Sequence, residues 1–384
     1  MGKSGRRAYG FDEVAIVPSR RTRDPEDVST AWEIDAYRFE LPLLASAMDS
    51  VVSPAVAVAV GRLGGLAVLN LEGLWTRYDD PTPLLAEIAA LPPATATRRM
   101  QELYAEPVRA ELIRARLAEV RDGGVTVAAS LTPQRTVRFL DAVLDSGVDL
   151  FVIQGTVVSA EHVSSRSEPL NLKRFIADLD VPVIVGGCAT YMTALHLMRT
   201  GAAGVLVGVG PGQADNARGV LGIGVPMATA VADAAGARRD YLDESGGRYV
   251  HVIADGGMRT GGDVAKAVAC GADAVMLGSP LARAAEAPGL GWHWGMEAVH
   301  RDLPTGARVR VGTAGSLAEV LLGPATTDDG TTNLFGALRA SMATTGYSTL
   351  KEFQRVELMV APAVQTEGKA LQLAQGVGMG RAVS

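Results

Sequence analysis

The sequence Gly208-Val-Gly-Pro-Gly-Gln-Ala-Asp-Asn-Ala-Arg218 directly follows a short apolar run, Ala203–Val207, that we interpret as a buried strand. Three glycines within five residues leave a backbone without Cβ atoms, so a flat or charged ligand can approach it closely. In α/β enzymes, loops at the carboxyl ends of parallel strands carry the chemistry. An ordinary tight turn has the same composition, so the rest of the chain must decide between the two interpretations.

Eight apolar runs have the near-continuous hydrophobicity of parallel strands that are covered on both faces. They are Leu41–Ala47, Leu66–Asn70, Val125–Leu131, Asp149–Gln154, Val181–Gly186, Ala203–Gly208, Tyr249–Ala254 and Ala272–Gly278. Helical patterns lie between or after them at Pro54–Leu63, Gln134–Ser146, Leu170–Leu179, Tyr191–Thr200, Pro226–Ala235 and Gly261–Ala269. This alternation predicts an α/β fold, a (β/α)8 TIM barrel. The alternative is a doubly wound open sheet, but its glycine fingerprint would follow the first strand, whereas here the glycine loops come later.

The size of the chain suits one large barrel. Its 384 residues are 48% hydrophobic and 20% charged, which is ordinary for a globular protein with a substantial core. We therefore expect a single domain over residues 1–384. The interval 71–122 has Leu and Val at helical spacing among Arg, Glu and Ala, and is predicted to be a helical elaboration at the barrel rim. A helix is expected from Leu334, and residues 363–384 are predicted to form a mobile tail.

Charge and apolar patterning exclude several classes of partner. The net charge is −6 and no block of basic residues occurs, so we expect no nucleic-acid partner. The apolar runs are too short to span a bilayer, and the basic amino terminus lacks the apolar stretch of a signal peptide, so we expect no membrane partner. Cys188 and Cys270 lie in apolar contexts, which favours reduced thiols in a cytoplasmic protein.

Three glycine-bearing loops fall at the ends of late strands: 208–212, Asp255-Gly-Gly257 and Gly278-Ser279. In a barrel they would gather on one rim. The last two suit a phosphate, because backbone N–H groups and a serine hydroxyl at helix amino termini receive its oxygens. Asp255 beside them could accept hydrogen bonds from a ribose diol. A pair of β-turns with a helix-capping serine is the structural alternative.

The sequences of many segments and their order along the chain resemble the inosine monophosphate dehydrogenase and guanosine monophosphate reductase family, in its short actinobacterial form without CBS domains. The resemblance covers most of the chain and rests on many segments in one order. These are Phe11-Asp-Glu-Val-Ala-Ile-Val-Pro18, Leu44-Ala-Ser-Ala-Met-Asp-Ser50, Gly61-Arg-Leu-Gly-Gly-Leu66, the 208–212 loop, Ile253-Ala-Asp-Gly-Gly257, Val275-Met-Leu-Gly-Ser-Pro-Leu-Ala282, His293-Trp-Gly-Met296 and Gly336-Ala-Leu-Arg-Ala-Ser-Met342.

The resemblance implies a purine nucleoside 5′-monophosphate as substrate, NADPH or NADH (NADP or NAD) as cofactor, and a homotetramer or homo-octamer. It implies that Ser46 and Met48 belong to the loop that lines the nucleotide and that Asp255 binds the ribose. Gly257, Gly278 and Ser279 would then bind the phosphate, and the backbone of Gly295 and Met296 would meet the purine edge. The carbonyls of Gly210 and Gly212 would help to bind a potassium ion. Gln154, followed by Gly155, stands where larger members place an Asp near the nicotinamide ribose.

Two further residues have competing interpretations. His293 is expected either to touch the phosphate, where larger relatives use Tyr, or to be a capping or surface residue. Glu297 directly follows Met296, so it is a candidate for the purine edge, with a solvated helix start as the alternative. The neighbouring Trp292 and Trp294 are expected to pack in the core or the flap rather than to stack on a cofactor.

The chain departs from the family at the loop that carries its catalytic cysteine. That loop normally reads Gly-x-Gly-Pro/Ser-Gly-Ser-x-Cys-Thr-Thr-Arg, and its Cys attacks C2 of the purine. Here Asp215 replaces the Cys, Asn216 and Ala217 replace the two Thr, and Gln213 replaces the phosphate-contacting Ser. The mobile flap with its Arg-Tyr pair has no match, which leaves a short flap region at 287–308.

The aspartate at position 215 changes the chemistry that is expected. A carboxylate is a poor nucleophile for a purine carbon, so the covalent thioimidate route is closed. A protonated Asp215 can donate to a purine ring nitrogen, which lets hydride add directly to the adjacent carbon and ammonia leave. The prediction is NAD(P)H-dependent reductive deamination of AMP or GMP. AMP is favoured because its N1 is an acceptor.

Three alternatives stay open. Asp215 could act as a general base for water adding to C2, which would make the protein an atypical IMP dehydrogenase that converts IMP to XMP with NAD. Cys188, near the purine by analogy, could substitute as nucleophile. The protein could also be a catalytically inactive regulatory subunit that binds a purine nucleotide.

Overall fold

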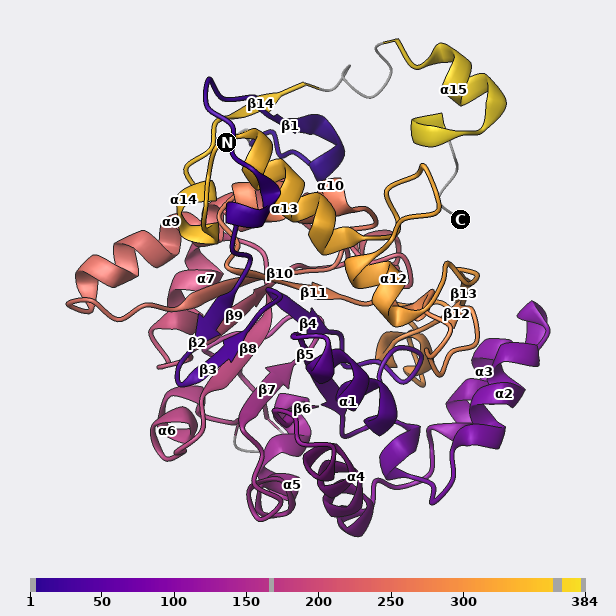
Figure 1. The fold of residues 1–384 in the computed structure, drawn as a ribbon. Helices are drawn as coiled ribbons and strands as arrows, with labels where there is room; N and C mark the ends of the chain where they lie inside the picture. The colour runs from indigo at the N-terminus through magenta and orange to yellow at the C-terminus, as the bar shows by residue number, and fades with distance from the viewer. Residues whose placement is uncertain (1–4, 166–168, 362–367, 381–384) are drawn as a thin grey trace.

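A closed barrel of eight parallel strands forms the centre of the protein (Figure 1). The computed structural model describes residues 5–165, 169–361 and 368–380. In sequence order the barrel strands are β4 (Leu43–Ala45), β5 (Leu66–Asn70), β6 (Ala128–Leu131), β7 (Leu150–Gln154), β8 (Val183–Cys188), β9 (Gly204–Val207), β10 (His251–Asp255) and β11 (Ala274–Leu277), and β11 closes the barrel against β4. Each predicted run overlaps one of these strands, although β8 and β10 extend two residues and one residue past their predicted ends, so the (β/α)8 prediction is confirmed.

Helices follow the strands and cover the barrel from outside. They are α1 (Pro54–Arg62), α5 (Pro133–Leu144), α6 (Leu172–Ala177), α7 (Tyr191–Met198), α9 (Met227–Glu244), α10 (Gly261–Ala269) and α13 (Leu334–Thr344). The side chains of Ser53 and Thr260 cap α1 and α10 by accepting a backbone N–H three residues on. Helix α9 runs well past the predicted end at 235, because its buried face continues through Ala237 and Tyr241 beyond Gly236.

The core explains why the strand runs look continuously apolar. Every residue of β5, β6, β9 and β11 is buried, because one face of each strand fills the barrel interior and the other meets the helices. The polar exceptions, Asn70 and Ser130, lie near the carboxyl ends of their strands. Polar groups are therefore concentrated where the active sites of barrels lie.

The interval 71–122 is helical. It holds η3 (Leu74–Thr76), α2 (Thr82–Ala90), α3 (Pro93–Leu103) and α4 (Ala110–Asp122). Helix α4 packs against α1 and α5, whereas α2 and α3 stand out from the barrel wall beside β12 (Trp292–His293) and β13 (Val309–Arg310) (Figure 1). A second hydrophobic cluster, separate from the barrel core, joins them to the 294–299 segment: Leu74, Leu85, Ile88, Met100, Leu103, Tyr104, Trp294, Ala298 and Val299.

Small elements complete the chain. Two antiparallel pairs join β1 (Val14–Ile16) to β14 (Leu358–Val360) and β2 (Trp32–Ile34) to β3 (Tyr37–Phe39). The remaining short helices are η1 (Phe11–Glu13), η2 (Pro25–Asp27), α8 (Ala217–Val220), α11 (Ser279–Ala282), η4 (Met296–Val299), α12 (Leu317–Leu322), α14 (Leu350–Phe353), α15 (Ala370–Gln375) and η5 (Gly378–Gly380). Within the predicted tail, residues 363–367 and 381–384 lie outside the described residues, and α15 lies between them. None of the described helices is long and apolar enough to cross a bilayer.

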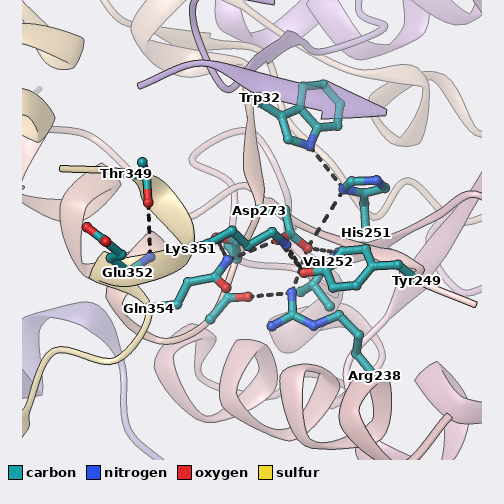
Figure 2. A network of polar contacts seen from close by, with 12 residues as sticks. Trp32, Arg238, Tyr249, His251, Val252, Asp273, Thr349, Lys351, Glu352 and Gln354 are labelled. Atoms are coloured by element: carbon teal, nitrogen blue, oxygen red, sulfur yellow. Dashed lines mark hydrogen bonds and ion pairs between the residues drawn. The ribbon is translucent and has the colours of Figure 1, made fainter. Parts of the chain in front are cut away.

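A buried carboxylate organises the amino-terminal end of the barrel (Figure 2). Asp273, just before β11, is 1% exposed. It accepts hydrogen bonds from the side chains of Arg238 (2.6 Å), Tyr249 (2.7 Å), Lys351 (2.6 Å) and Gln354 (3.0 Å) and from the amide of Val252 (2.9 Å). The indole N–H of Trp32 donates to Nδ1 of His251 at 3.1 Å. These hydrogen bonds connect α14 and the β2–β3 hairpin to the amino-terminal end of the barrel, where side chains usually contribute to stability and not to catalysis.

Candidate active site

A cavity opens at the carboxyl ends of the barrel strands, and its empty space, including open solvent at the mouth, is about 1140 Å³. Parts of the glycine loop after β9 and of the 293–297 segment complete its wall. It brings together most of the residues predicted from the sequence: Ser46, Met48, Gln154, Gly155, Gly210, Gly212, Asp215, Asp255, Gly257, Gly278, Ser279, His293, Met296 and Glu297. The glycine-rich stretch is thus part of a cavity wall and not an isolated turn.

The loop after β9 holds Asp215 in a defined place. Gly210 has a φ of +69°, and a Cβ there would lie 3.3 Å from Oδ1 of Asp215, so a side chain would be strained and crowded. The amide of Asp215 donates to the carbonyl of Gly212 at 3.1 Å. Oδ1 of Asp215 accepts from the amide of Ala217, the first residue of α8, at 2.6 Å. One carboxylate oxygen is therefore anchored to the backbone, and the side chain is half-buried in the cavity wall.

The flap region 287–308 is packed against this loop. Asp215 and Gly306 form an antiparallel bridge, flanked by hydrogen bonds from Asn216 N to Thr305 O (2.6 Å) and from Ala307 N to Ala214 O (2.8 Å). A Cβ at Gly306 would lie 2.9 Å from the amide nitrogen of Ala298, so only glycine fits without rearrangement. The amide of Thr305 in turn donates to the carbonyl of Glu297 at 3.0 Å. The two segments that carry Asp215 and Glu297 are thereby joined.

Four residues with carboxyl groups line one cavity, Glu72, Asp215, Asp255 and Glu297, and the last three have raised pKa values. Burial and, to a smaller extent, the charges of Glu297 and Asp215 together raise the pKa of Asp255 to about 7, against the opposing hydrogen bond from Gln154. Burial also raises the pKa values of Glu297 and Asp215. No group of three such ligands able to hold a metal ion occurs among the described residues. Burial in the cavity wall thus favours the protonated forms of Asp215, Asp255 and Glu297 relative to exposed carboxyl groups.

One end of the cavity suits a phosphate. Gly257 has a φ of +77°, and Ser279 begins α11 after β11. Both also line an adjoining cavity with an empty volume of about 780 Å³. Gln213, which the sequence resemblance predicts to replace a phosphate-contacting serine, lies in that second cavity with Arg218 and Arg259. Asp12 and Asp263 line the same cavity, and Arg259 lies 3.7 Å from Asp263, so the two arginines offer guanidinium donors to an anion without a net positive charge.

His293 lies in the wall between these loops and the flap. Its Nδ1 is 3.1 Å from Oγ of Ser50, and a Cβ at Gly278 would lie 3.2 Å from its ring. Burial lowers the pKa of His293 to about 4, so the imidazole is neutral at neutral pH. It can offer a phosphate a hydrogen bond but no charge. The alternative of a surface histidine is wrong, because the residue is 2% exposed.

The structure corrects three sequence predictions. Cys188 is 1% exposed, its Sγ donates to the carbonyl of Leu206 at 3.4 Å, and burial raises its pKa to about 12. It packs in the core and is not part of the cavity wall, so its assignment to the substrate, and with it the role of substitute nucleophile, is wrong. Gly295 does not line the cavity either, because Met48 and Glu297 occupy the space beside its Cα. Glu297 faces the cavity, so the solvated helix start is wrong.

Other residues of the wall were missed. Asn70, Glu72, Ser130, Thr132 and Thr156 line the side of the cavity formed by β5, β6 and β7. Asn70 ends a predicted strand and Ser130 lies one residue before the end of another, and a polar residue at the carboxyl end of a barrel strand is itself a signal of a site. That signal was present in the sequence.

Comparison with known proteins agrees with this geometry. The sequence pattern of the IMP dehydrogenase / GMP reductase domain matches residues 8–370. The chain belongs to the IMP dehydrogenase/GMP reductase family. An uncharacterized oxidoreductase of Mycobacterium tuberculosis is 55% identical over 368 residues, which span 94% of this chain and 98% of that protein. The inosine-5′-monophosphate dehydrogenase of Methanocaldococcus jannaschii is 26% identical, with 94% of each chain covered.

A solved structure resembles the whole barrel. The crystal structure of an IMP dehydrogenase/GMP reductase-like protein from Corynebacterium glutamicum has a TM-score of 0.89 and 49% identity, and covers 94% of this chain and 96% of its own. Membership of the IMP dehydrogenase/GMP reductase family confirms the expected class, an NAD(P)-dependent oxidoreductase. Family membership does not identify the reaction of this chain, because the mycobacterial relatives that match it over nearly their full length at 55% identity are named as uncharacterized oxidoreductases.

Proposed function

We propose that the protein catalyses NAD(P)H-dependent reductive deamination of an aminopurine nucleoside 5′-monophosphate, AMP or GMP, with Asp215 as proton donor. The observation that carries the proposal is the place of Asp215. It occupies the loop position where the family carries a cysteine, its side chain faces the cavity, and burial raises its pKa. The loop thus presents an acid to the base where a thiolate would otherwise attack.

The nucleotide is oriented by the two ends of the cavity. The loops of Gly257 and Ser279, with the guanidinium groups beyond them, receive the phosphate. Asp255 lies between these loops and Gln154, where it accepts hydrogen bonds from a ribose diol. Met48, Met296 and Glu297 then meet the base. This orientation brings the base towards Asp215.

The step balances with Asp215 as the only acid. Asp215 donates a proton to a ring nitrogen, and hydride adds to the adjacent carbon, which is C6 in AMP and C2 in GMP. The Asp215 carboxylate then takes the proton back from the ring nitrogen and passes it to the amino group, which leaves that carbon as ammonia while the ring regains its aromaticity. Overall, one hydride and one proton enter and one ammonia leaves. When bound, a reduced nicotinamide would supply the hydride, and the residues left to hold it lie at the ends of β5, β6 and β7, opposite the phosphate loops.

Two alternatives rest on specific observations. Asp255, with a pKa of about 7, could remove a proton from water, which keeps an atypical IMP dehydrogenase in view. The absence of a cavity-facing thiol among the described residues also fits a binding subunit without turnover. A potassium ion at Gly210 and Gly212, and a homotetramer or homo-octamer, remain proposals of the same kind. The carbonyl of Gly212 already accepts the amide of Asp215.

The decisive experiment follows nicotinamide absorbance and ammonia release with AMP, GMP, IMP and XMP in both redox directions. NADPH or NADH oxidation with stoichiometric ammonia from AMP or GMP supports the proposal. NAD reduction with IMP alone supports the dehydrogenase, and no turnover with tight nucleotide binding supports the binding subunit. Asp215→Asn should lower turnover by about 10²- to 10⁴-fold while nucleotide affinity is kept. Asp302→Asn, on the exposed part of the same flap, is the matched control and should change nothing.

A further inference from the structure

The strongest unexplained feature of the cavity is the side-chain amide of Asn70. Asn70 ends β5, is 6% exposed, and lines the cavity. Its Nδ2 is buried and has no hydrogen-bond partner among residues 5–165, 169–361 and 368–380. A buried donor without a partner is unfavourable, because it has lost its hydrogen bonds to water. The side of the cavity formed by β5, β6 and β7 therefore contains a donor that an acceptor on a ligand would satisfy.

The orientation of this amide is fixed by its neighbours. The backbone N–H of Glu72 donates to Oδ1 of Asn70 at 3.0 Å, so the oxygen is occupied and the nitrogen is the free atom. Glu72 is itself held, because its Oε1 accepts from the amide of Thr132 at 2.7 Å and its Oε2 lies 3.8 Å from the guanidinium of Arg135. A rotation that exchanged the two ends of the amide would set nitrogen against nitrogen. The donor is thus built into the site.

A second polar group lies beside the first. Ser130 is the register partner of Asn70 on β6, and such partners lie about 4.8 Å apart across a sheet. Ser130 is 6% exposed and lines the cavity, and its hydroxyl makes no hydrogen bond within the described part of the chain. A hydroxyl both donates and accepts. Together the two residues offer one N–H donor and one adaptable hydroxyl on adjacent strands.

We infer that Asn70 and Ser130 form the binding site for the primary carboxamide of the nicotinamide ring. This inference rests on the proposed function and names the cofactor side of the same cavity. The Nδ2 of Asn70 donates to the carboxamide oxygen, and the Oγ of Ser130 accepts from the carboxamide NH₂. The phosphate and nucleotide loops follow β9, β10, β11 and β4, which leaves the ends of β5, β6 and β7 for the second ligand. Gln154 at the end of β7 borders the same side.

The test measures equilibrium binding of NADPH and NADH by fluorescence, without turnover. Asn70→Leu keeps the size of the side chain and removes the donor, and Asn70→Asp replaces the donor by an acceptor. Both should weaken reduced-dinucleotide binding by about 10- to 100-fold, because each loses one buried hydrogen bond. Affinity for AMP and GMP should stay within about twofold. Ser245→Ala, at the exposed end of α9, is the control and should bind as the parent does.

A cofactor analogue separates the two residues. In reduced 3-acetylpyridine adenine dinucleotide phosphate, a methyl group replaces the carboxamide NH₂ and the carbonyl oxygen is kept. Ser130→Ala should weaken NADPH binding about 5- to 10-fold and leave analogue binding unchanged, whereas Asn70→Leu should weaken both. The comparison of NADPH with its analogue in Ser130→Ala still tests the inference if the Asn70 variants do not fold.

The outcomes distinguish this inference from the proposed function. Equal NADPH affinity in the parent and both Asn70 variants overturns the carboxamide site and leaves the proposed function standing. A loss of AMP or GMP affinity in place of NADPH affinity means that the pair contacts the purine, which also overturns it. If the parent binds neither NADPH nor NADH, the proposed function itself fails and this inference with it.

Discussion

The phenol of Tyr104 donates a 2.6 Å hydrogen bond to Oδ2 of Asp49 and accepts one of 2.9 Å from the indole N–H of Trp294. Tyr104 follows helix α3 of the rim, Asp49 follows Met48 of the cavity wall, and Trp294 precedes Met296. All three side chains are buried. One hydroxyl therefore joins the rim helices to two segments that line the cavity.

Removing the hydroxyl of Tyr104 should destabilise the junction between the rim helices and the two segments that carry Asp49 and Trp294. In Tyr104→Phe, Trp294 loses its partner and Asp49 keeps only the 2.8 Å bond from the amide of Leu74, although Oδ1 of Asp49 already has no partner among the described residues. We expect the free energy of unfolding to fall by about 2–3 kcal/mol, as measured by urea denaturation. Tyr78→Phe is the control. Its half-buried hydroxyl donates only to the carbonyl of Leu103, so its loss should cost about 1 kcal/mol or less. Equal losses in the two variants would contradict this role for the junction.

The barrel could be predicted from the sequence because its strands are buried on both faces and read as apolar runs. The cavity could be predicted because glycines and polar residues stand where those runs end. The Tyr104–Asp49 bond could not, since its partners are 55 residues apart and meet only through a hydrophobic cluster that no periodicity reveals. The misassigned Cys188 shows the converse limit. It stands at a strand end like the site residues, but packing directs its side chain into the core.

Asp255 should lower stability at alkaline pH. Its pKa is about 7 in the fold and about 3.9 in an unfolded chain, so between these values the folded state holds a proton that the unfolded state has released. Stability from this group therefore falls as pH rises from about 4 to 7, by at most about 4 kcal/mol. Asp255→Asn should be more stable than the parent at pH 8, and this gain should be much smaller at pH 5. Urea denaturation at both values tests it, and a difference independent of pH would refute it.

Cys188→Ala should keep full turnover. The thiol is buried in the core and burial raises its pKa to about 12, so it supplies no thiolate to the cavity. The variant should lose about 1 kcal/mol of stability from the vacated volume and retain its kcat within about twofold. The measurements are steady-state kinetics with the substrate that the nicotinamide absorbance assay identifies and thiol labelling of the folded parent. A loss of turnover beyond tenfold in a folded variant would restore the thiol to the mechanism.

His251 should begin to destabilise the fold at a higher pH than the buried carboxylate of Asp273 does when the solution is acidified. Trp32 donates to Nδ1 of His251, which requires a neutral ring, and burial lowers its pKa to about 4, against about 6.5 in an unfolded chain. As pH falls from 6.5 to 4, His251 becomes protonated in the unfolded state but stays neutral in the folded state, so about 3 kcal/mol of the free energy of unfolding is lost. His293, also lowered to about 4, adds a similar loss over the same range. Because Asp255 contributes an opposite change over the same range, the test compares variant with parent: between pH 7.5 and 4.5, His251→Gln should lose about 2–3 kcal/mol less unfolding free energy than the parent. Asp273, whose pKa Arg238 and Lys351 hold well below its usual range despite burial, contributes stability that is lost only below about pH 4, so the two effects separate. An undiminished fall in His251→Gln would assign the acid sensitivity elsewhere.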